Sequence, residues 1–380
     1  MIRFDSVTKT YPDGTVAVRE LSLAAPSGKI TVLVGPSGCG KTTCLRMINR
    51  MIEPTAGRIL VDGKDTASID SATLRRGMGY VIQHAGLFPH RTIVANIATV
   101  PVLLGWGREK ANARALELME RVGLPRSFAK RYPAQLSGGQ QQRVGVARAL
   151  AADPPIMLMD EPFSAVDPVV REQLQDEFLR LQQELGKTIV FVTHDIDEAI
   201  KLGDQVAVLR EGGQLAQLAP PEQLLAHPAD DFVADFVGKD RGYRALGFRR
   251  HDFPVSPEPT VRLGAPADEV RASSADVWVL VLDEDSAPVG WVERERVDGT
   301  VRRDALNRGG TVASSEDSLR QVLDAALSSP SGRGVVVGAD GAFIGTVRAQ
   351  DLIGPIEATS KDRPGPTESP APSPHPPGGD

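Results

Sequence analysis

Short apolar runs alternate with helical patterns through the first part of the chain. Residues 2–7, 16–23 and 30–35 show the alternating or continuous apolar positions of β-strands. A glycine-rich loop follows the third run, which is apolar enough for a buried strand, and a helical pattern then covers 41–51. Strand, loop and helix in this order form the local structure that a phosphate-binding loop requires.

Helical patterns dominate the middle of this region. Apolar positions recur at helical spacing in 109–122 and 139–152. Two more apolar runs, 156–159 and 188–192, fit buried strands, and the pattern between them predicts a helix over 168–185. Strands that alternate with helices predict a parallel sheet.

Changes in composition divide the chain into four segments. Residues 1–238 hold the elements above and predict a first domain, and 239–259, with its arginines and prolines, predicts a linker. Residues 260–356 predict a smaller second domain. The Pro-, Ser- and Gly-rich residues 357–380 cannot bury a core, so we expect a disordered tail.

Overall composition is that of an ordinary soluble protein, with 41% hydrophobic and 24% charged residues among 380. A net charge of -6 disfavours extended binding to nucleic acid. Cys39 and Cys44 suggest neither a disulfide framework nor a metal site and fit a reducing cytosol. The chain shows no signal peptide and no run near the roughly 18 apolar residues that span a bilayer. We therefore expect any membrane role to come through a partner.

A phosphate-binding pattern occupies the glycine-rich loop. The pattern G-x-x-x-x-G-K-[ST] is matched by Gly35, Pro36, Ser37, Gly38, Cys39, Gly40, Lys41 and Thr42, and Thr43 follows. The glycines let backbone N–H groups point at phosphates, Lys41 can neutralise their oxygens, and Thr42 offers a hydroxyl to Mg²⁺. A chance match in a glycine-rich turn is the alternative, and the strand and helix on either side argue against it.

Two carboxylates end the apolar run 156–159. Asp160 can enter the shell of a Mg²⁺ ion, and Glu161 can orient or deprotonate an attacking water. Alone, two acids after a strand more often form a solvated strand end. With the phosphate-binding pattern upstream, we interpret them as part of a nucleotide site.

A third pattern, Leu136-Ser137-Gly138-Gly139-Gln140, opens a helix and offers N–H groups and a hydroxyl to an anion. A plain capped helix start, with Ser137 as the N-cap, is the alternative. The pentapeptide, placed upstream of Asp160, resembles the signature of ABC (ATP-binding cassette) ATPases. With the other patterns, this resemblance covers about residues 1–238.

The resemblance assigns further residues by their positions. Tyr11 corresponds to the aromatic that stacks on adenine, although a surface or core tyrosine is the alternative. Gln83 corresponds to a glutamine that links metal and water to the membrane partner. Asp167 ends a segment that crosses the dimer, with Val166 where leucine is commoner, and His194 corresponds to the histidine that contacts the γ-phosphate. A histidine after a strand is otherwise usually structural.

The implied fold is an α/β P-loop NTPase cassette, with a RecA-like core and a helical subdomain. The implied cofactors are ATP and Mg²⁺, the metal held by Thr42, Gln83 and Asp160. The resemblance also implies a homodimer in which Ser137, Gly138, Gly139 and Gln140 of one subunit face the nucleotide of the other. Two integral-membrane permease subunits and an extracytoplasmic solute-binding protein would complete the assembly, with the chain peripheral on the cytoplasmic face of the plasma membrane.

Longer stretches carry a narrower resemblance. Residues 47–54, 79–83 and 191–201 are similar to the ATPases of glycine betaine, carnitine and choline importers. His84 departs from the glutamine expected there. Another small solute, such as an amino acid or polyamine, is the alternative cargo. A soluble ABC ATPase of DNA repair or translation is disfavoured by the single cassette and the lack of a basic tract.

The second domain is predicted to be small and α+β, and it resembles CBS (cystathionine-β-synthase) motifs. A helix over 316–327, strands over 334–337 and 343–347, and a helix from Asp351 carry this resemblance, and a weaker copy covers 277–297. Paired motifs of this family often sense nucleotides or ionic strength. Arg348 replaces a usual hydroxyl residue and Arg296 replaces the acid of the first copy, so an inert module and a ligand sensor both stay open.

Overall fold

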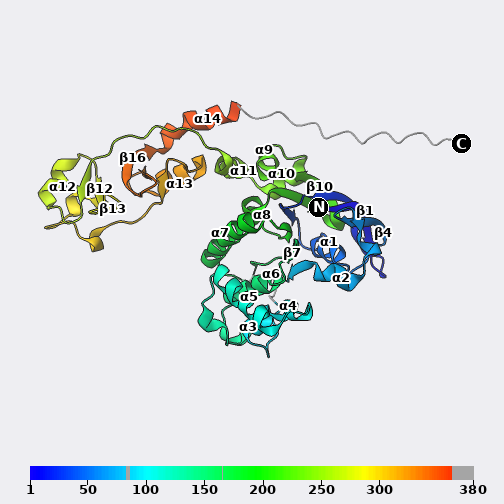
Figure 1. The fold of residues 1–380 in the computed structure, drawn as a ribbon. Coiled ribbons are helices and arrows are strands. Elements are labelled where there is room, and N and C mark those ends of the chain that lie inside the picture. Colours follow the sequence, from blue (N-terminus) through cyan, green and yellow to red (C-terminus); the bar gives the residue numbers. More distant parts are fainter. Residues whose placement is uncertain (83–85, 165, 362–380) are drawn as a thin grey trace. The chain divides into compact units, whose positions relative to one another are not determined.

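The computed structural model describes residues 1–82, 86–164 and 166–361, and it divides into two compact units (Figure 1). Unit 1 comprises Met1–Leu224 and Pro228–Gly238, and unit 2 comprises Leu225–His227 and the residues from Lys239 onward. Within the described residues, no helix is both long and apolar enough to cross a membrane.

Unit 1 contains two sheets. One is antiparallel, in the order β2-β1-β4-β5, and is formed by β1 (Ile2–Thr10), β2 (Val16–Ala25), β4 (Ala56–Val61) and β5 (Lys64–Asp65). The other has the order β10-β9-β3-β8-β7-β6 and is formed by β3 (Ile30–Val34), β6 (Met78–Val81), β7 (Ile156–Asp160), β8 (Thr188–Val192), β9 (Gln205–Arg210) and β10 (Gln214–Ala219). Its strands pair in parallel except for β10, which confirms the predicted parallel sheet. Every residue of β3, β7 and β8 is buried, as a parallel sheet covered on both faces requires.

Helices cover this sheet and form a separate helical part. They are α1 (Lys41–Ile48), α2 (Ser71–Arg76), α3 (Ile93–Ile97), α4 (Thr99–Leu103), α5 (Arg108–Arg121), α6 (Gly138–Leu150), α7 (Pro168–Leu185), α8 (Ile196–Leu202), α9 (Pro221–Ala226) and α10 (Asp231–Val237). In the helical part, α3, α4 and α5 pack against α6 (Figure 1). Helix α6 also contacts β6 of the main sheet. The helix predicted over 41–51 ends early, because Asn49 caps it and Arg50 adopts a left-handed backbone with φ 53°.

Unit 2 is built from two similar halves. Each has a three-stranded sheet with one parallel and one antiparallel pairing, in the orders β11-β12-β13 and β14-β15-β16. The elements are α11 (Arg241–Ala245), β11 (Thr260–Arg262), α12 (Ala267–Ser273), β12 (Trp278–Leu282), β13 (Pro288–Glu293), β14 (Val312–Ser314), α13 (Leu319–Ser328), β15 (Arg333–Val337), β16 (Phe343–Arg348) and α14 (Ile353–Lys361). The predicted tail from residue 357 begins inside α14, and 362–380 lie outside the described residues.

The segment 239–259 differs from the linker that its composition suggested. Leu246 is buried in the core of the second half, with Tyr243 and Phe253 packed against that core. Ser256 exchanges two backbone hydrogen bonds of 2.8 Å with Thr346 of β16. The prolines and arginines of this segment therefore connect anchoring residues that the composition did not reveal.

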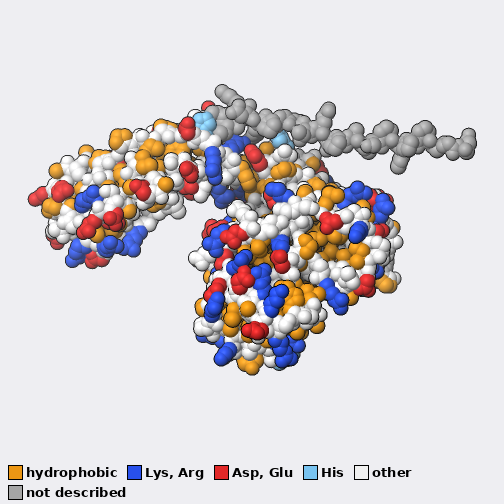
Figure 2. Space-filling view, viewed as in Figure 1, with side chains coloured by type: hydrophobic (Ala, Val, Ile, Leu, Met, Phe, Trp, Pro, Cys, Tyr) orange, Lys and Arg blue, Asp and Glu red, His pale blue; other side chains and the backbone are white. Residues whose placement is uncertain are grey.

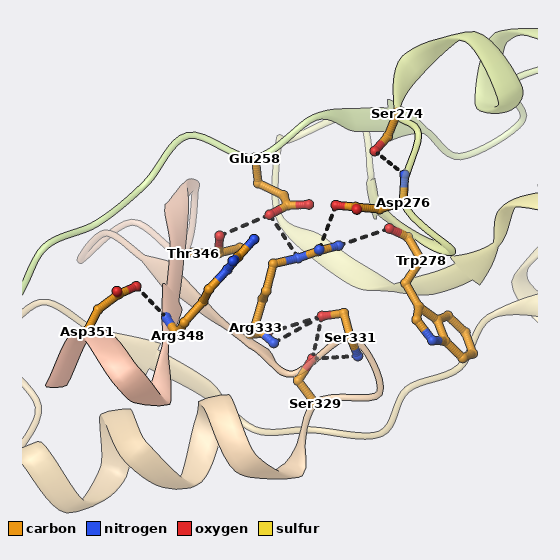
Figure 3. Close-up of polar contacts among 10 residues, drawn as sticks. All are labelled: Glu258, Ser274, Asp276, Trp278, Ser329, Ser331, Arg333, Thr346, Arg348 and Asp351. Carbon is orange, nitrogen blue, oxygen red and sulfur yellow. Dashed lines mark hydrogen bonds and ion pairs between the residues drawn. The ribbon is translucent and has the colours of Figure 1, made fainter. Parts of the chain in front are cut away.

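An ion pair joins the two halves of unit 2 (Figure 3). Arg333 of β15 lies 3.1 Å from the carboxylate of Glu258 and 2.7 Å from that of Asp276, and it donates to the carbonyl of Trp278. Glu258 also accepts a hydrogen bond from Thr346. Burial raises the pKa of Glu258, and Arg333 and Thr346 offset this only in part. Loss of Glu258 would leave the Arg333 guanidinium without its buried partner, so the pair constrains how the two halves join.

Replacing Glu258 with Ala should lower the free energy of unfolding of unit 2 by roughly 3 kcal/mol, because it removes the buried partner of Arg333. Urea unfolding, followed by the fluorescence of Trp278 and Trp291, measures the change. Glu293→Ala is the matched control, since its partner Arg296 is 80% exposed and such pairs contribute little. Equal losses in the two variants would contradict the prediction.

Candidate functional site

The loop between β3 and α1 is shaped by its glycines. At Gly40 the backbone has φ 94°, and a Cβ atom there would lie 2.2 Å from the carbonyl oxygen of Ala17, so no larger residue fits. Gly40 is also the N-cap of α1 and makes no side-chain cap. The first turn of α1 thus offers N–H groups and the positive end of the helix dipole to an anion.

Lys41 bends back over this loop. Its ammonium donates to the carbonyl oxygens of Gly35 and Pro36, at 2.8 Å each, and its side chain is buried. Cys39, which is part of the loop, is fully buried, and this burial raises the pKa of its thiol. The loop therefore surrounds the ammonium of Lys41, and the Cys39 thiol beside it stays protonated.

Thr42 and Asp160 meet at the carboxyl ends of the strands of the main sheet. The Thr42 hydroxyl donates to the Asp160 carboxylate at 2.9 Å, and Asp160 ends β7. Burial raises the pKa of Asp160, while the Thr42 hydroxyl acts against that shift. Beside them, the Tyr11 hydroxyl lies 3.4 Å from that of Thr43. Hydroxyl and carboxylate oxygens are ligands suited to Mg²⁺, which takes its remaining ligands from water and phosphates.

No group of three or more His, Cys, Asp or Glu side chains able to hold a metal occurs in the part of the chain that the structure describes. The pair of Thr42 and Asp160 nevertheless fits a Mg²⁺ ion that phosphate oxygens help to bind. Gln83, the third predicted ligand, lies outside the described residues, as does His84.

Glu161 and His194 form a second pair next to Asp160. The Glu161 carboxylate lies 3.2 Å from Nδ1 of His194, and the imidazole is 57% exposed. Glu161 adopts a left-handed backbone with φ 45°, which is rare outside glycine and costs on the order of 1 kcal/mol. Its N–H donates to Val192 of β8, and Ser164 donates to its carbonyl. Strain that is held by neighbouring strands in this way is typical of functional sites.

The segment 137–140 lies on the helical part. The Ser137 hydroxyl caps α6 by accepting a hydrogen bond from the Gln140 N–H. In turn, the Gln140 side-chain oxygen accepts one from the Ser137 N–H. This confirms the capped helix start. The same residues line a cleft of about 570 Å³ together with Asp167, Arg143 and Phe128, and no residue of the phosphate-binding loop is among its lining residues. Within one chain, the two predicted halves of the nucleotide site thus line separate surfaces.

Nothing in the sequence indicates one buried polar residue in the helical part. Asn96 of α3 is fully buried, and its amide bonds to the backbone of the loop that follows position 85. A single asparagine inside an apolar helical pattern carries no signal of such a role. Only its burial and its partners reveal it.

Comparisons with known proteins identify the family. The family described as ABC transporter matches residues 18–164. The chain is 44% identical to the osmoprotectant import ATP-binding protein OsmV of Salmonella typhimurium, over 96% of this chain and 98% of that protein. It is 48% identical to the carnitine transport ATP-binding protein OpuCA of Listeria monocytogenes, over 78% of this chain and 76% of that protein.

A solved structure supports the cassette fold of the first unit. The ATP-binding cassette MJ0796, as a dimer in a post-hydrolysis state bound to ADP and Pi, is 35% identical, with a TM-score of 0.54. The match covers 58% of this chain and 99% of that one. With the phosphate-binding loop and both polar pairs in place, the chain belongs to the family of ATP-binding subunits of ABC transporters.

Proposed function

We propose that this chain is the ATP-hydrolysing subunit of an importer of quaternary-amine osmolytes such as glycine betaine, carnitine or choline. Two contacts at the carboxyl ends of the main-sheet strands support hydrolysis best. Thr42 bonds to Asp160, and Glu161 lies against His194. The names of relatives that match most of the chain support the cargo. Import places the chain at the cytoplasmic face of the plasma membrane.

The roles follow from the chemistry of each group. Lys41 and the N-terminus of α1 bind the phosphates, while Tyr11 packs on the adenine. Thr42, Asp160 and Gln83 would hold Mg²⁺, which when bound would supply positive charge against the phosphates. Glu161 accepts a proton from the attacking water and His194 keeps its carboxylate aligned. Burial of the site favours these charge interactions over those with bulk water.

A second copy of the chain completes the site. Ser137 and Gly139 lie at the N-terminus of α6, in a cleft separate from the phosphate-binding loop, and Asp167 borders the same cleft. A homodimer brings this cleft of one subunit onto the loop of the other, so that ATP is enclosed between them. Hydrolysis then loosens the dimer and supplies the motion that drives transport.

A surface that includes Ile82 suits the two permease subunits. A cleft of about 580 Å³ is lined by Arg46, Arg50, Met51, Ile52, Arg75, Tyr80 and Ile82. Met51 and Ile82, which expose 56% and 36% of their surface, both line this cleft, and apolar surface gathered at one place often marks a protein interface. The permeases in turn receive solute from an extracytoplasmic binding protein.

The two similar halves of unit 2 support the CBS-like interpretation and a regulatory role. Asp351 already engages the backbone N–H of Arg348, its own helix start. If unit 2 is a sensor, salt or a nucleotide will change the rate of transport through it. If unit 2 is an inert module, neither will.

Two other functions are weaker candidates. Import of an amino acid or polyamine would use the same hydrolytic residues. A soluble ABC ATPase that acts on nucleic acid is disfavoured. Basic and acidic side chains are mixed over the face drawn in Figure 2, whereas binding to phosphate backbones favours clustered basic side chains.

Glu161→Gln should reduce ATP turnover by at least about 100-fold and trap an ATP-bound dimer, because the amide cannot accept the proton. Phosphate release and gel filtration with ATP measure the two effects. Glu172→Gln, at an exposed position on α7, is the control. A Glu161→Gln variant with full turnover would exclude Glu161 as the base.

Deleting the gene should abolish uptake of labelled glycine betaine, carnitine or choline, and the wild-type copy should restore it. A Lys41→Ala copy should not, since the phosphates lose their cation. Undiminished uptake of all three solutes with lost uptake of an amino acid or polyamine would favour the alternative cargo.

Removing residues 239–380 should leave ATP hydrolysis intact and change how salt controls transport in reconstituted vesicles. An identical salt response in the full-length and shortened transporters would make unit 2 a structural module.

A further inference from the structure

We propose that Asn96 is a positioning residue, which holds residues 86–92 in the shape that meets the permease, and that Arg148 fastens this segment to α6. We call residues 86–92 the contact loop. The inference rests on the proposed permease partner and concerns how hydrolysis is coupled to it.

The amide of Asn96 is the internal anchor of the contact loop. Its Oδ1 accepts from the Phe88 N–H at 2.7 Å, and its Nδ2 lies 3.1, 3.0 and 3.1 Å from the carbonyl oxygens of Phe88, Arg91 and Thr92. The side chain is 0% exposed. One buried amide thus binds the backbone at three positions of an otherwise exposed loop.

These bonds determine which groups the loop presents. Because the backbone of Phe88 and Arg91 bonds inward to Asn96, their side chains are left at the surface. Phe88 is 39% exposed, and the Arg91 guanidinium stacks on its ring at 4.9 Å from the centroid. An exposed aromatic residue on a rigid backbone is the kind of group that anchors a protein interface.

The start of the loop is fixed from another direction. Arg148 of α6 donates to the carbonyl of Gly86 at 2.6 Å. Gly86 has φ 52°, and a Cβ atom there would lie 2.2 Å from Cδ1 of Ile82. Ile82 lines the proposed permease cleft, so the loop begins directly against that surface.

Helix α6 therefore connects two functional surfaces. Its first residues border the cleft proposed to meet the nucleotide of the second subunit, and Arg148 lies near its other end. A helix is stiff over this length, so a shift of Ser137 moves the anchor of Gly86 as well. Asn96 ensures that the contact loop moves as one body with that anchor.

The test compares the isolated chain with the transporter reconstituted in vesicles with its permeases and binding protein. Asn96→Asp replaces a donor with a carboxylate that faces three carbonyl oxygens and so displaces the loop. We expect kcat and KM for ATP of the isolated chain to stay within about twofold, while stimulation by glycine betaine in vesicles falls about tenfold.

Gln182→Ala is the matched control. Gln182 is also a buried amide that donates to two loop carbonyls, those of Gly28 and Lys187, but at a turn remote in sequence from the contact loop. It should lower the melting temperature and leave stimulation unchanged. If Asn96→Asp does not fold, Arg148→Met provides the test, since it removes the bond to the Gly86 carbonyl and should reduce stimulation in the same way.

The two possible failures can be told apart. Normal stimulation in a folded Asn96→Asp or Arg148→Met variant would overturn the positioning role. A wild-type chain that neither co-purifies with the permeases nor responds to them would overturn the proposed function instead. Equal loss in the isolated chain and in vesicles would show a merely structural role.

Discussion

The register of three neighbouring strands determines the geometry of the proposed hydrolytic site. In β8, Val192 pairs with Leu33 of β3 on one side and with Asp160 of β7 on the other. Parallel strands in register place their carboxyl ends at one level, so the phosphate-binding loop, Glu161 and His194 emerge together. A shift of one residue in either pairing would turn Asp160 away from Thr42. Buried valine, isoleucine and leucine side chains pack on both faces of these strands and hold that register, so the core supports the geometry of the proposed site.

Most of this arrangement could be predicted because it is local. The loop from Gly35 to Thr42 carries its own pattern, and the helix over Pro168–Leu185 has the predicted bounds. Helix α1 was predicted too long, since nothing in the sequence marks the left-handed turn at Arg50. The pairing of Glu161 with His194 depends on strand order, which resemblance supplied and hydrophobic pattern alone could not.

What the sequence could not show depends on contacts that only the folded backbone creates. Asn96 looks like an ordinary helix residue until its four bonds to the neighbouring loop are seen. Glu258 lies in a proline-rich stretch that suggests solvent, yet its carboxylate is buried against Arg333 and Thr346. In both cases a polar side chain gains its role from groups that the fold brings against it. The partners are 4 to 8 residues away for Asn96 and 88 residues away for Glu258 and Thr346, and composition averages over such contacts.

The path of residues 243–256 has a consequence for how the protein is made. This segment leaves the ribosome before either half of unit 2, but its apolar side chains complete the core of the half that is synthesised last. During translation, Tyr243, Leu246 and Phe253 can therefore be buried only after β16 and Leu352 have emerged from the ribosome. Nascent chains, and fragments that stop between the two halves, expose these residues, which makes them substrates for chaperones and proteases.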